Sequence, residues 1–238
     1  FLNLARSFIR ERKFMNVPRL LNGMRRARLY VEYAWTKRYW KRPAPDRPYV
    51  YFPLQYSNEC TIIIGCPQCY EQGAVLELIS RGLPDGVELC FKQHPNNPAE
   101  GSSLAMIRRA VRLPNTRLLP VSMNSWDMAR RARAVVTIDN TVGFESLLLR
   151  RPVVVLGYPA YRGWGVTRDV ADLNDLPARL DEALNGGDLP EERLWDFLAS
   201  FDSEHIKGNW FDPPYDPEDL ARSLAEQRDR IQADAAAG

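Results

Sequence analysis

Residues 134–157 read AVVTIDNTVGFESLLLRRPVVVLG, and this stretch decides the fold. The runs VVTI and VVVL are apolar without interruption, as expected of central parallel strands that are covered on both faces. Residues 142–150 lie between these runs and have the length and apolar spacing of a helix. A strand, a helix and a second strand in this order predict a right-handed βαβ unit.

The same alternation of short apolar runs and longer amphipathic runs begins near residue 48. Strands are predicted for five segments: Tyr49–Leu54, Val87–Lys92, Arg117–Val121, Ala134–Ile138 and Val153–Leu156. Helices are predicted for four segments: 70–82, Leu104–Val111, Ser125–Arg133 and Val142–Arg150. The sequence therefore predicts the α/β class, with a doubly wound, Rossmann-like parallel sheet and flanking helices.

The composition is that of an ordinary globular chain, with 238 residues, 45% apolar and 26% charged. We divide the chain into a basic helical segment and linker over residues 1–47, a Rossmann-like domain over residues 48–189, and C-terminal helices over residues 190–238. No apolar run reaches the ~18 residues that a membrane span requires, and no secretory signal pattern opens the sequence. Four cysteines are too few for a disulfide scaffold, so we expect a reducing, cytoplasmic setting.

Residues 1–42 carry twelve Lys and Arg residues against only Glu11 and Glu32. A basic segment that also contains aromatic residues can lie on anionic lipid or bind nucleic acid, and it can equally be a solvated helical face. No recognisable nucleic-acid module follows the segment, so we do not expect nucleic acid as a partner. Two interpretations stay open: a solvated helical face, or peripheral contact with an anionic membrane at its inner face.

Polar residues follow the second predicted strand, at the sheet edge where ligands bind in doubly wound folds. Pro95 biases His94 away from helical geometry, so the imidazole can be held at the strand end. There it can donate a hydrogen bond to a phosphate or a leaving-group oxygen, with Lys92 adding positive charge. A lone loop histidine is equally compatible with a structural role.

A second polar segment follows the fourth predicted strand and opens the helix after it. Asn140 and Thr141 are candidates for the helix N-cap, and the same geometry can hold a phosphate through free N–H groups and the Thr141 hydroxyl. Gly143 is expected to permit close approach of such a ligand. Glu145 lies in the first turn, where its carboxylate complements the helix dipole and can accept hydrogen bonds from ribose hydroxyls.

Together these stretches resemble the capsule polysaccharide biosynthesis family, which includes the bacterial β-Kdo transferases. The resemblance covers about residues 49–184, with its motifs in the family's order. The motifs are YVYFPLQY at 49–56 with Glu59, LPDGVEL at 83–89, KQHP at 92–95, LPN at 113–115, VTI at 136–138, TVGFE at 141–145 and RPVVVLG at 151–157.

The resemblance implies the donor-binding C-terminal half of a GT-B glycosyltransferase. The implied reaction transfers a sugar, Kdo in the family's named members, from a CMP-sugar donor to a capsular or surface polysaccharide or a glycolipid acceptor. His94 is the implied catalytic residue, and no metal or other cofactor is implied. The implied donor-nucleotide residues are Lys92, Pro95, Asn140, Thr141, Val142, Gly143, Glu145, Gln55 and Glu59.

The chain departs from the family's pattern at two of these positions. Gln55 stands where the family usually has a histidine, and Asn140 replaces the first of two hydroxyl residues before Val-Gly. The resemblance also implies an acceptor-side domain, with the family's catalytic carboxylate, upstream of residue 1.

Two other functional hypotheses stay open beside the glycosyltransferase. The first is a non-catalytic nucleotide-binding or scaffold module that uses the same site. The second is a thiol-redox protein, because Cys66 and Cys69 form a C-x-x-C element at a helix start. The spacing of the four cysteines does not match the common zinc knuckles, so no metal site is expected.

Overall fold

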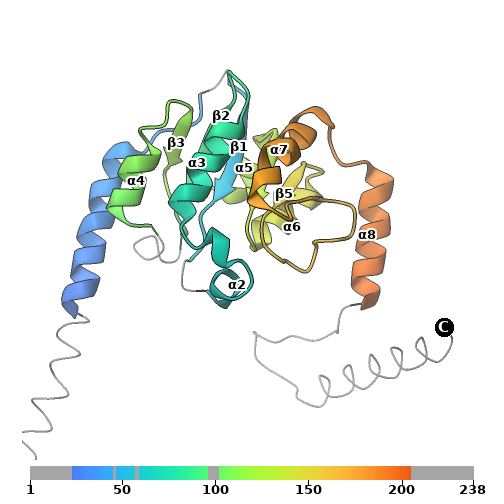
Figure 1. The fold of residues 1–238 in the computed structure, drawn as a ribbon, viewed down its shortest axis with the longest axis horizontal. Helices are drawn as coiled ribbons and strands as arrows, with labels where there is room; N and C mark the ends of the chain where they lie inside the picture. Colours follow the sequence, from blue (N-terminus) through green and yellow to red (C-terminus); the bar gives the residue numbers. More distant parts are fainter. Residues whose placement is uncertain (1–22, 45–46, 57–58, 96–101, 205–238) are drawn as a thin grey trace, which may run out of the picture. The chain divides into compact units, whose positions relative to one another are not determined.

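The computed structural model describes residues 23–44, 47–56, 59–95 and 102–204 (Figure 1). The chain divides into two compact units, residues 1–189 and residues 190–238. In the second unit the described helix is α8 (Glu191–Glu204). The first 22 residues of the basic segment predicted over residues 1–47, and the part of the predicted C-terminal helices beyond residue 204, lie outside the described residues. None of the described helices is long and apolar enough to cross a membrane.

The first unit is built on one six-stranded parallel sheet with the strand order β3-β2-β1-β4-β5-β6. The strands are β1 (Tyr49–Pro53), β2 (Glu88–Lys92), β3 (Thr116–Leu119), β4 (Ala134–Thr137), β5 (Val153–Val155) and β6 (Arg168–Asp169). The chain runs outward from β1 to β3 and then returns to β4 on the other side of β1. This reversal is the switch point of a Rossmann-like sheet, and the predicted fold class is confirmed.

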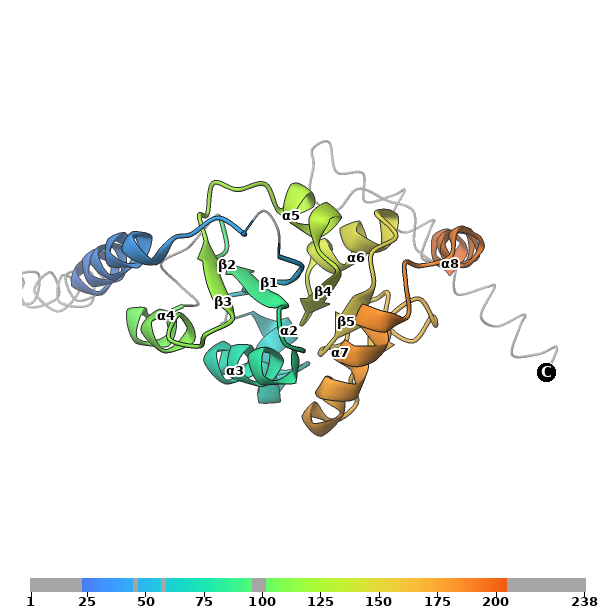
Figure 2. The same cartoon turned by 90° about the horizontal axis from the view of Figure 1, so that it is seen from above.

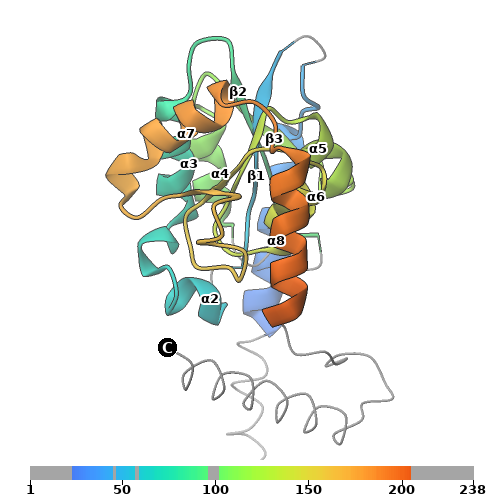
Figure 3. The same ribbon diagram turned by 90° about the vertical axis from the view of Figure 1, so that its right-hand side faces the viewer.

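Helices cover both faces of this sheet (Figures 2 and 3). On one face lie α2 (Cys60–Ile63), α3 (Gln72–Gly82), α4 (Leu104–Ala110) and α7 (Leu176–Asn185). On the other lie α5 (Ser125–Arg131) and α6 (Thr141–Leu148). Three short 3-10 turns complete the described unit: η1 (Lys37–Tyr39), η2 (Pro67–Cys69) and η3 (Leu173–Asp175). Residues 23–36 are helical and lie beside α4.

The central strand β1 is buried along its whole length, because its side chains alternate between two apolar clusters. Val50 and Phe52 belong to the cluster that contains residues of α3 and α7. Tyr49 and Tyr51 belong to the cluster on the α5 side, which includes Met128. A strand covered on both faces needs apolar or aromatic residues at every position, which explains why its sequence does not alternate with polar residues.

Some predicted boundaries shift for local physical reasons. The third strand ends at Leu119 rather than at Val121, since Pro120 has no N–H with which to continue a ladder. The helix predicted to end at Arg133 ends at Arg131, because Ala132 has extended backbone angles and leads directly into β4. The two-residue strand β6 was not predicted, since its length is too short to show a period of two.

A buried ion pair joins β2 and β3 at their amino-terminal ends. The Glu88 side chain is only 5% exposed and accepts hydrogen bonds from Nε and Nη2 of Arg117, the latter at 2.7 Å. Arg47 adds a longer ionic contact at 3.7 Å. The hydrogen bonds from Arg117 hold the pKa of Glu88 below its usual value, and burial opposes them. The ionised carboxylate is therefore favoured in the folded state.

We expect Glu88→Gln to lower the free energy of unfolding at pH 7 by roughly 1–3 kcal/mol, because Arg117 then loses a charged partner. A lowered folded-state pKa stabilises the fold above the carboxyl's ordinary value of 4.5 and loses that effect as the pH falls below it. Urea titrations from pH 7 to pH 3 should thus show a shallower acid loss in Glu88→Gln than in the unmodified protein. Glu77→Gln is the control, because Glu77 pairs with two exposed arginines. Its free energy of unfolding and its acid profile should differ little from those of the unmodified protein. Parallel acid profiles would contradict this role of Glu88.

Candidate functional site

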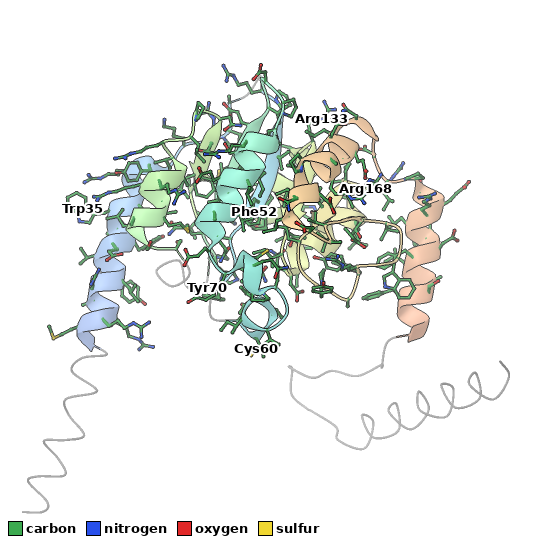
Figure 4. All side chains as sticks on the ribbon, in the orientation of Figure 1. Trp35, Phe52, Cys60, Tyr70, Arg133 and Arg168 are labelled. Carbon is green, nitrogen blue, oxygen red and sulfur yellow. The ribbon has the colours of Figure 1, made fainter. Side chains whose placement is uncertain are left out.

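The site lies at the carboxyl edge of the sheet, where β1, β2 and β4 end around the switch point. Gln55 follows β1, Lys92 closes β2 with His94 just after it, and Asn140 follows β4. Parallel strands bring these ends to one edge, although the residues are far apart in sequence. Figure 4 shows this edge at the end of the molecule where Cys60 and Tyr70 are labelled.

His94 is half-buried and packs against an aromatic ring. Its ring centroid lies 4.3 Å from that of Tyr56, with an interplanar angle of 39°. Burial lowers the pKa of His94 and Lys92 lowers it further, while the negative charge of Glu59 acts in the opposite direction. The imidazole is therefore held in its neutral form near pH 7, where one ring nitrogen donates a hydrogen bond and the other accepts one.

Lys92 is a buried cation, only 3% exposed, and it turns toward the segment between β3 and α5. Its Nζ donates to the Met123 carbonyl at 2.8 Å and to the Ser125 hydroxyl at 2.7 Å. Tyr51 donates to the same hydroxyl at 3.3 Å. Burial lowers the pKa of Lys92, and the nearby Glu145 carboxylate opposes that shift. These bonds fix the ammonium group in place.

A cavity of about 580 Å³ opens beside Lys92. Its volume falls in the range of small-molecule sites. It brings together three predicted residues with five that the sequence analysis missed; the lining is Lys92, Pro95, Glu145, Val121, Met123, Asn124, Ser125 and Trp126. These five residues follow β3, a fourth strand end, and carry no phosphate-binding motif. His94 and Thr141 lie outside this lining.

Asn140 caps the start of α6 as predicted, but the space beside Gly143 is occupied by a side chain of the protein. The Asn140 side chain accepts a hydrogen bond from Gly143 N at 3.3 Å, as an N-cap does. A β-carbon on Gly143 would lie 2.0 Å from Tyr161 Oη. The Tyr161 hydroxyl donates to the Asn140 carbonyl at 2.9 Å. Tyr161 thus fills the space that we expected Gly143 to leave for a ligand, while Thr141 is exposed.

Gln55 is buried, and its carboxamide binds main-chain groups after β4. Its Oε1 accepts from Asp139 N at 2.8 Å, and its Nε2 donates to the Asp139 carbonyl. The same Nε2 donates to Glu59 Oε2 at 3.3 Å. These three bonds occupy both N–H groups and one acceptor position of the carboxamide. Val142, also predicted in the donor set, is partly buried against the cluster on the α5 side.

The C-x-x-C element lies in the segment between β1 and α3, and both thiols are fully buried. The Cys66 thiol lies 3.5 Å from the Leu156 carbonyl. A hydrogen bond from Cys69 lowers the pKa of Cys66, and that same bond, together with burial, raises the pKa of Cys69. Such burial limits access for a partner disulfide. Within the described residues, no three His, Cys, Asp or Glu side chains are grouped to hold a metal ion.

We expect Gly143→Ala to destabilise the protein by roughly 1–3 kcal/mol, because the new methyl group meets Tyr161 in a packed core. An alanine normally stabilises a helix relative to glycine, so a loss of stability in Gly143→Ala would itself indicate the steric contact. Gly73→Ala in α3 is the matched control, since the atoms nearest to its β-carbon all belong to the unbranched side chain of Met106, beginning with Cγ. The measurement is thermal and urea unfolding. The contact is refuted if Gly143→Ala costs as much in a Tyr161→Ala background as in the unmodified chain.

Comparison with known proteins identifies related sequences. The chain matches the family described as capsule polysaccharide biosynthesis protein over residues 11–183. The lipopolysaccharide-processing protein LpsZ of Rhizobium meliloti is 28% identical over 137 residues, covering 53% of this chain and 28% of LpsZ. The capsule polysaccharide modification protein LipA of Neisseria meningitidis serogroup B is 24% identical over 139 residues, covering 58% of this chain and 20% of LipA. The chain therefore spans less than a third of the length of either relative.

Among solved structures, the chain aligns with that of Thermosulfurimonas dismutans KpsC, a beta Kdo 2,7 transferase. The TM-score is 0.45 and the sequence identity 20%, and the alignment covers 74% of this chain and 62% of that chain.

Proposed function

The chain belongs to the capsule polysaccharide biosynthesis family, as its motifs predicted, and on this premise we propose that it is the donor-binding half of a glycosyltransferase. The donor would be a CMP-sugar, with Kdo as the sugar, and the acceptor a capsular or surface polysaccharide or a glycolipid. The observation that carries this proposal is the cavity of about 580 Å³ beside Lys92, at the carboxyl edge of the sheet. Nucleotides bind at that position in doubly wound folds.

The charges in the cavity suit a ligand with one phosphate and several hydroxyl groups. Lys92 supplies one fixed ammonium group for the phosphate, and Glu145 supplies a carboxylate that can accept hydrogen bonds from ribose hydroxyls. Pro95 and Trp126 add apolar surface to the same lining. In this proposal the β3–α5 segment forms the wall of the nucleotide site, in addition to the predicted residues.

In the proposed reaction the bond between the sugar's anomeric carbon and the CMP phosphate oxygen breaks. The acceptor hydroxyl forms the new bond and gives up its proton to a base, which we place on an acceptor-side domain. The departing CMP phosphate gains negative charge. His94 would donate a hydrogen bond to that oxygen from its neutral ring, and the Thr141 hydroxyl would support it.

We expect calorimetry to show saturable binding of CMP to this chain. His94→Ala should retain CMP affinity within a few-fold but lower turnover of CMP-Kdo by roughly 100-fold in the enzyme that contains the chain, because its hydrogen bond strengthens only as charge develops. His94→Gln, which keeps an N–H donor, is the matched control and should recover part of the rate.

The same experiment separates the alternatives. Binding of CMP with no transfer in any form would favour a nucleotide-binding or scaffold module. The assignment of His94 is wrong if neither affinity nor turnover changes in His94→Ala. The absence of CMP binding would reject the proposed donor class.

We also propose that the chain acts in the cytoplasm at the inner face of an anionic membrane, which its basic helix contacts. Leu29, Tyr33 and Thr36 lie on the inner side of helical residues 23–36, where Thr36 is fully buried. The opposite side exposes Val31 at 58% and Trp35 at 45%, and Trp35 is labelled in Figure 4. Residues 23–42 contain seven Lys and Arg residues and one Glu. Apolar groups between basic residues are typical of interfacial helices.

We expect the chain to co-sediment with vesicles that contain phosphatidylglycerol and not with vesicles of phosphatidylcholine alone. Arg28→Gln with Arg38→Gln, at the two exposed basic residues nearest to Val31 and Trp35 on this side, should weaken binding roughly 10- to 30-fold, since each basic residue near such a surface contributes about 1 kcal/mol. The matched control replaces the exposed Arg130 and Arg131 of α5, and it should bind as the unmodified chain does. Equal losses in the two double variants would indicate a general charge effect and contradict the proposed contact.

A further inference from the structure

Two buried glutamines connect three segments at the carboxyl edge of the sheet. Gln72 is the first residue of α3 and is 1% exposed. Its Oε1 accepts a hydrogen bond from the main-chain N–H of Gln55 at 2.9 Å, and its Nε2 donates to the Gln55 carbonyl at 2.8 Å. The Gln55 side chain then repeats the same two-bond pattern on the N–H and carbonyl of Asp139.

Each carboxamide therefore makes the pair of main-chain hydrogen bonds that a neighbouring strand would otherwise make. The direct pairing of β1 with β4 covers only Val50 with Ala134 and Tyr51 with Val135. Beyond these pairs the two strands separate, and the peptide groups that follow them need other partners because buried N–H and carbonyl groups are costly to leave unpaired. The Gln55 side chain spans this gap from β1 to the segment after β4.

The connection reaches two parts of the candidate site. Asp139 directly precedes Asn140, the N-cap of α6, and α6 carries Glu145 in the cavity lining. Gln55 Nε2 also binds Glu59, whose charge acts on His94. One side chain thus fixes the start of α6 and a carboxylate near the histidine.

We propose that Gln55 and Gln72 are positioning residues, linked in series, that hold the β4–α6 segment at the geometry required for donor binding. This inference rests on the proposed function for its link to the donor. It replaces the expectation that Gln55 contacts the donor nucleotide itself, since the Gln55 carboxamide is already bonded to Asp139 and Glu59. Gln72 was not singled out in the sequence, because nothing local distinguishes it from a surface glutamine at a helix start.

The test uses Gln55→Met and Gln72→Met, which keep the side-chain length and remove the hydrogen bonds. Amide hydrogen exchange should speed up at residues 139–143 by roughly tenfold or more in each variant. CMP affinity, measured well below the unfolding temperature, should fall by roughly tenfold. Because the residues act in series, adding Gln72→Met to Gln55→Met should have little further effect on exchange at residues 139–143 or on CMP affinity.

The matched control is Asn115→Ala, which removes a similar carboxamide at the opposite edge of the sheet. Asn115 Nδ2 donates to the Ser80 carbonyl at 2.9 Å, just before β3 begins. We expect this variant to lose stability but to keep exchange at residues 139–143 and CMP affinity unchanged. The inference is overturned if exchange at residues 139–143 is unaffected by the Met variants, if the two effects are additive, or if Asn115→Ala reproduces them.

Failure of this inference and failure of the proposed function are distinguishable. Hydrogen exchange needs no ligand, so it tests the linkage even if the unmodified chain does not bind CMP. Faster exchange at residues 139–143 without CMP binding would retain the linkage and reject the donor. Unchanged exchange with normal CMP binding would reject the linkage and retain the donor.

Discussion

Strand β1 is the element on which the rest of the site depends, because it is hydrogen bonded on both sides and covered on both faces. It pairs with β2 over five residues and with β4 over two. After β1 the chain passes to α3 on one face of the sheet, and after β4 it passes to α6 on the other (Figure 2). The two strands therefore separate at their carboxyl ends, and that separation creates the crevice in which ligands of such folds bind.

A crevice of this kind exposes peptide groups and side chains to a partly dry environment, so each polar group needs a partner. The structure supplies these partners from distant segments. Gln55 binds Asp139, and Lys92 binds the β3–α5 segment through Met123 and Ser125. Such bonds contribute little net stability when made, but a buried group left without one is costly. The polar residues of the site are consequently fixed in position before any ligand arrives.

The strands of the sheet could be predicted from the sequence, but the contacts within the candidate site could not. The reason is that the strands follow from local patterns, whereas the site contacts join residues far apart in the sequence. The runs VVTI and VVVL reveal buried strands because burial on two faces constrains every residue in them. The N-cap role of Asn140 is also local and was available from the motif. The bond between Gln55 and Asp139 joins residues 84 positions apart, and no local pattern records it.

The same reasoning explains why the space beside Gly143 was expected to be open, and why the β3–α5 segment was not predicted to line the cavity. A glycine in the first turn of a helix suggests space for a ligand, but whether that space is empty depends on Tyr161, which lies 18 positions later and packs into it. The residues from Val121 to Trp126 carry no phosphate motif, and they matter because Lys92 turns toward them. The local signals therefore pointed to the sheet edge where the cavity opens, but not to the β3–α5 residues that line it.

Under the proposed function, the balance of charge in the cavity bears on which sugar donor would bind there. Among its described lining residues, Lys92 is the one cation and Glu145 the one carboxylate. A diphosphate would bring about two negative charges to a site with a single ammonium group, and burial already disfavours the charged form of that group. A monophosphate ester brings one negative charge for Lys92 and leaves Glu145 for hydroxyl groups. His94 lies outside this lining and is held neutral by burial, so in the proposed reaction it would donate a hydrogen bond to the leaving phosphate without adding a fixed charge beforehand. The charges of the lining are thus consistent with the nucleoside monophosphate sugar of the proposed function.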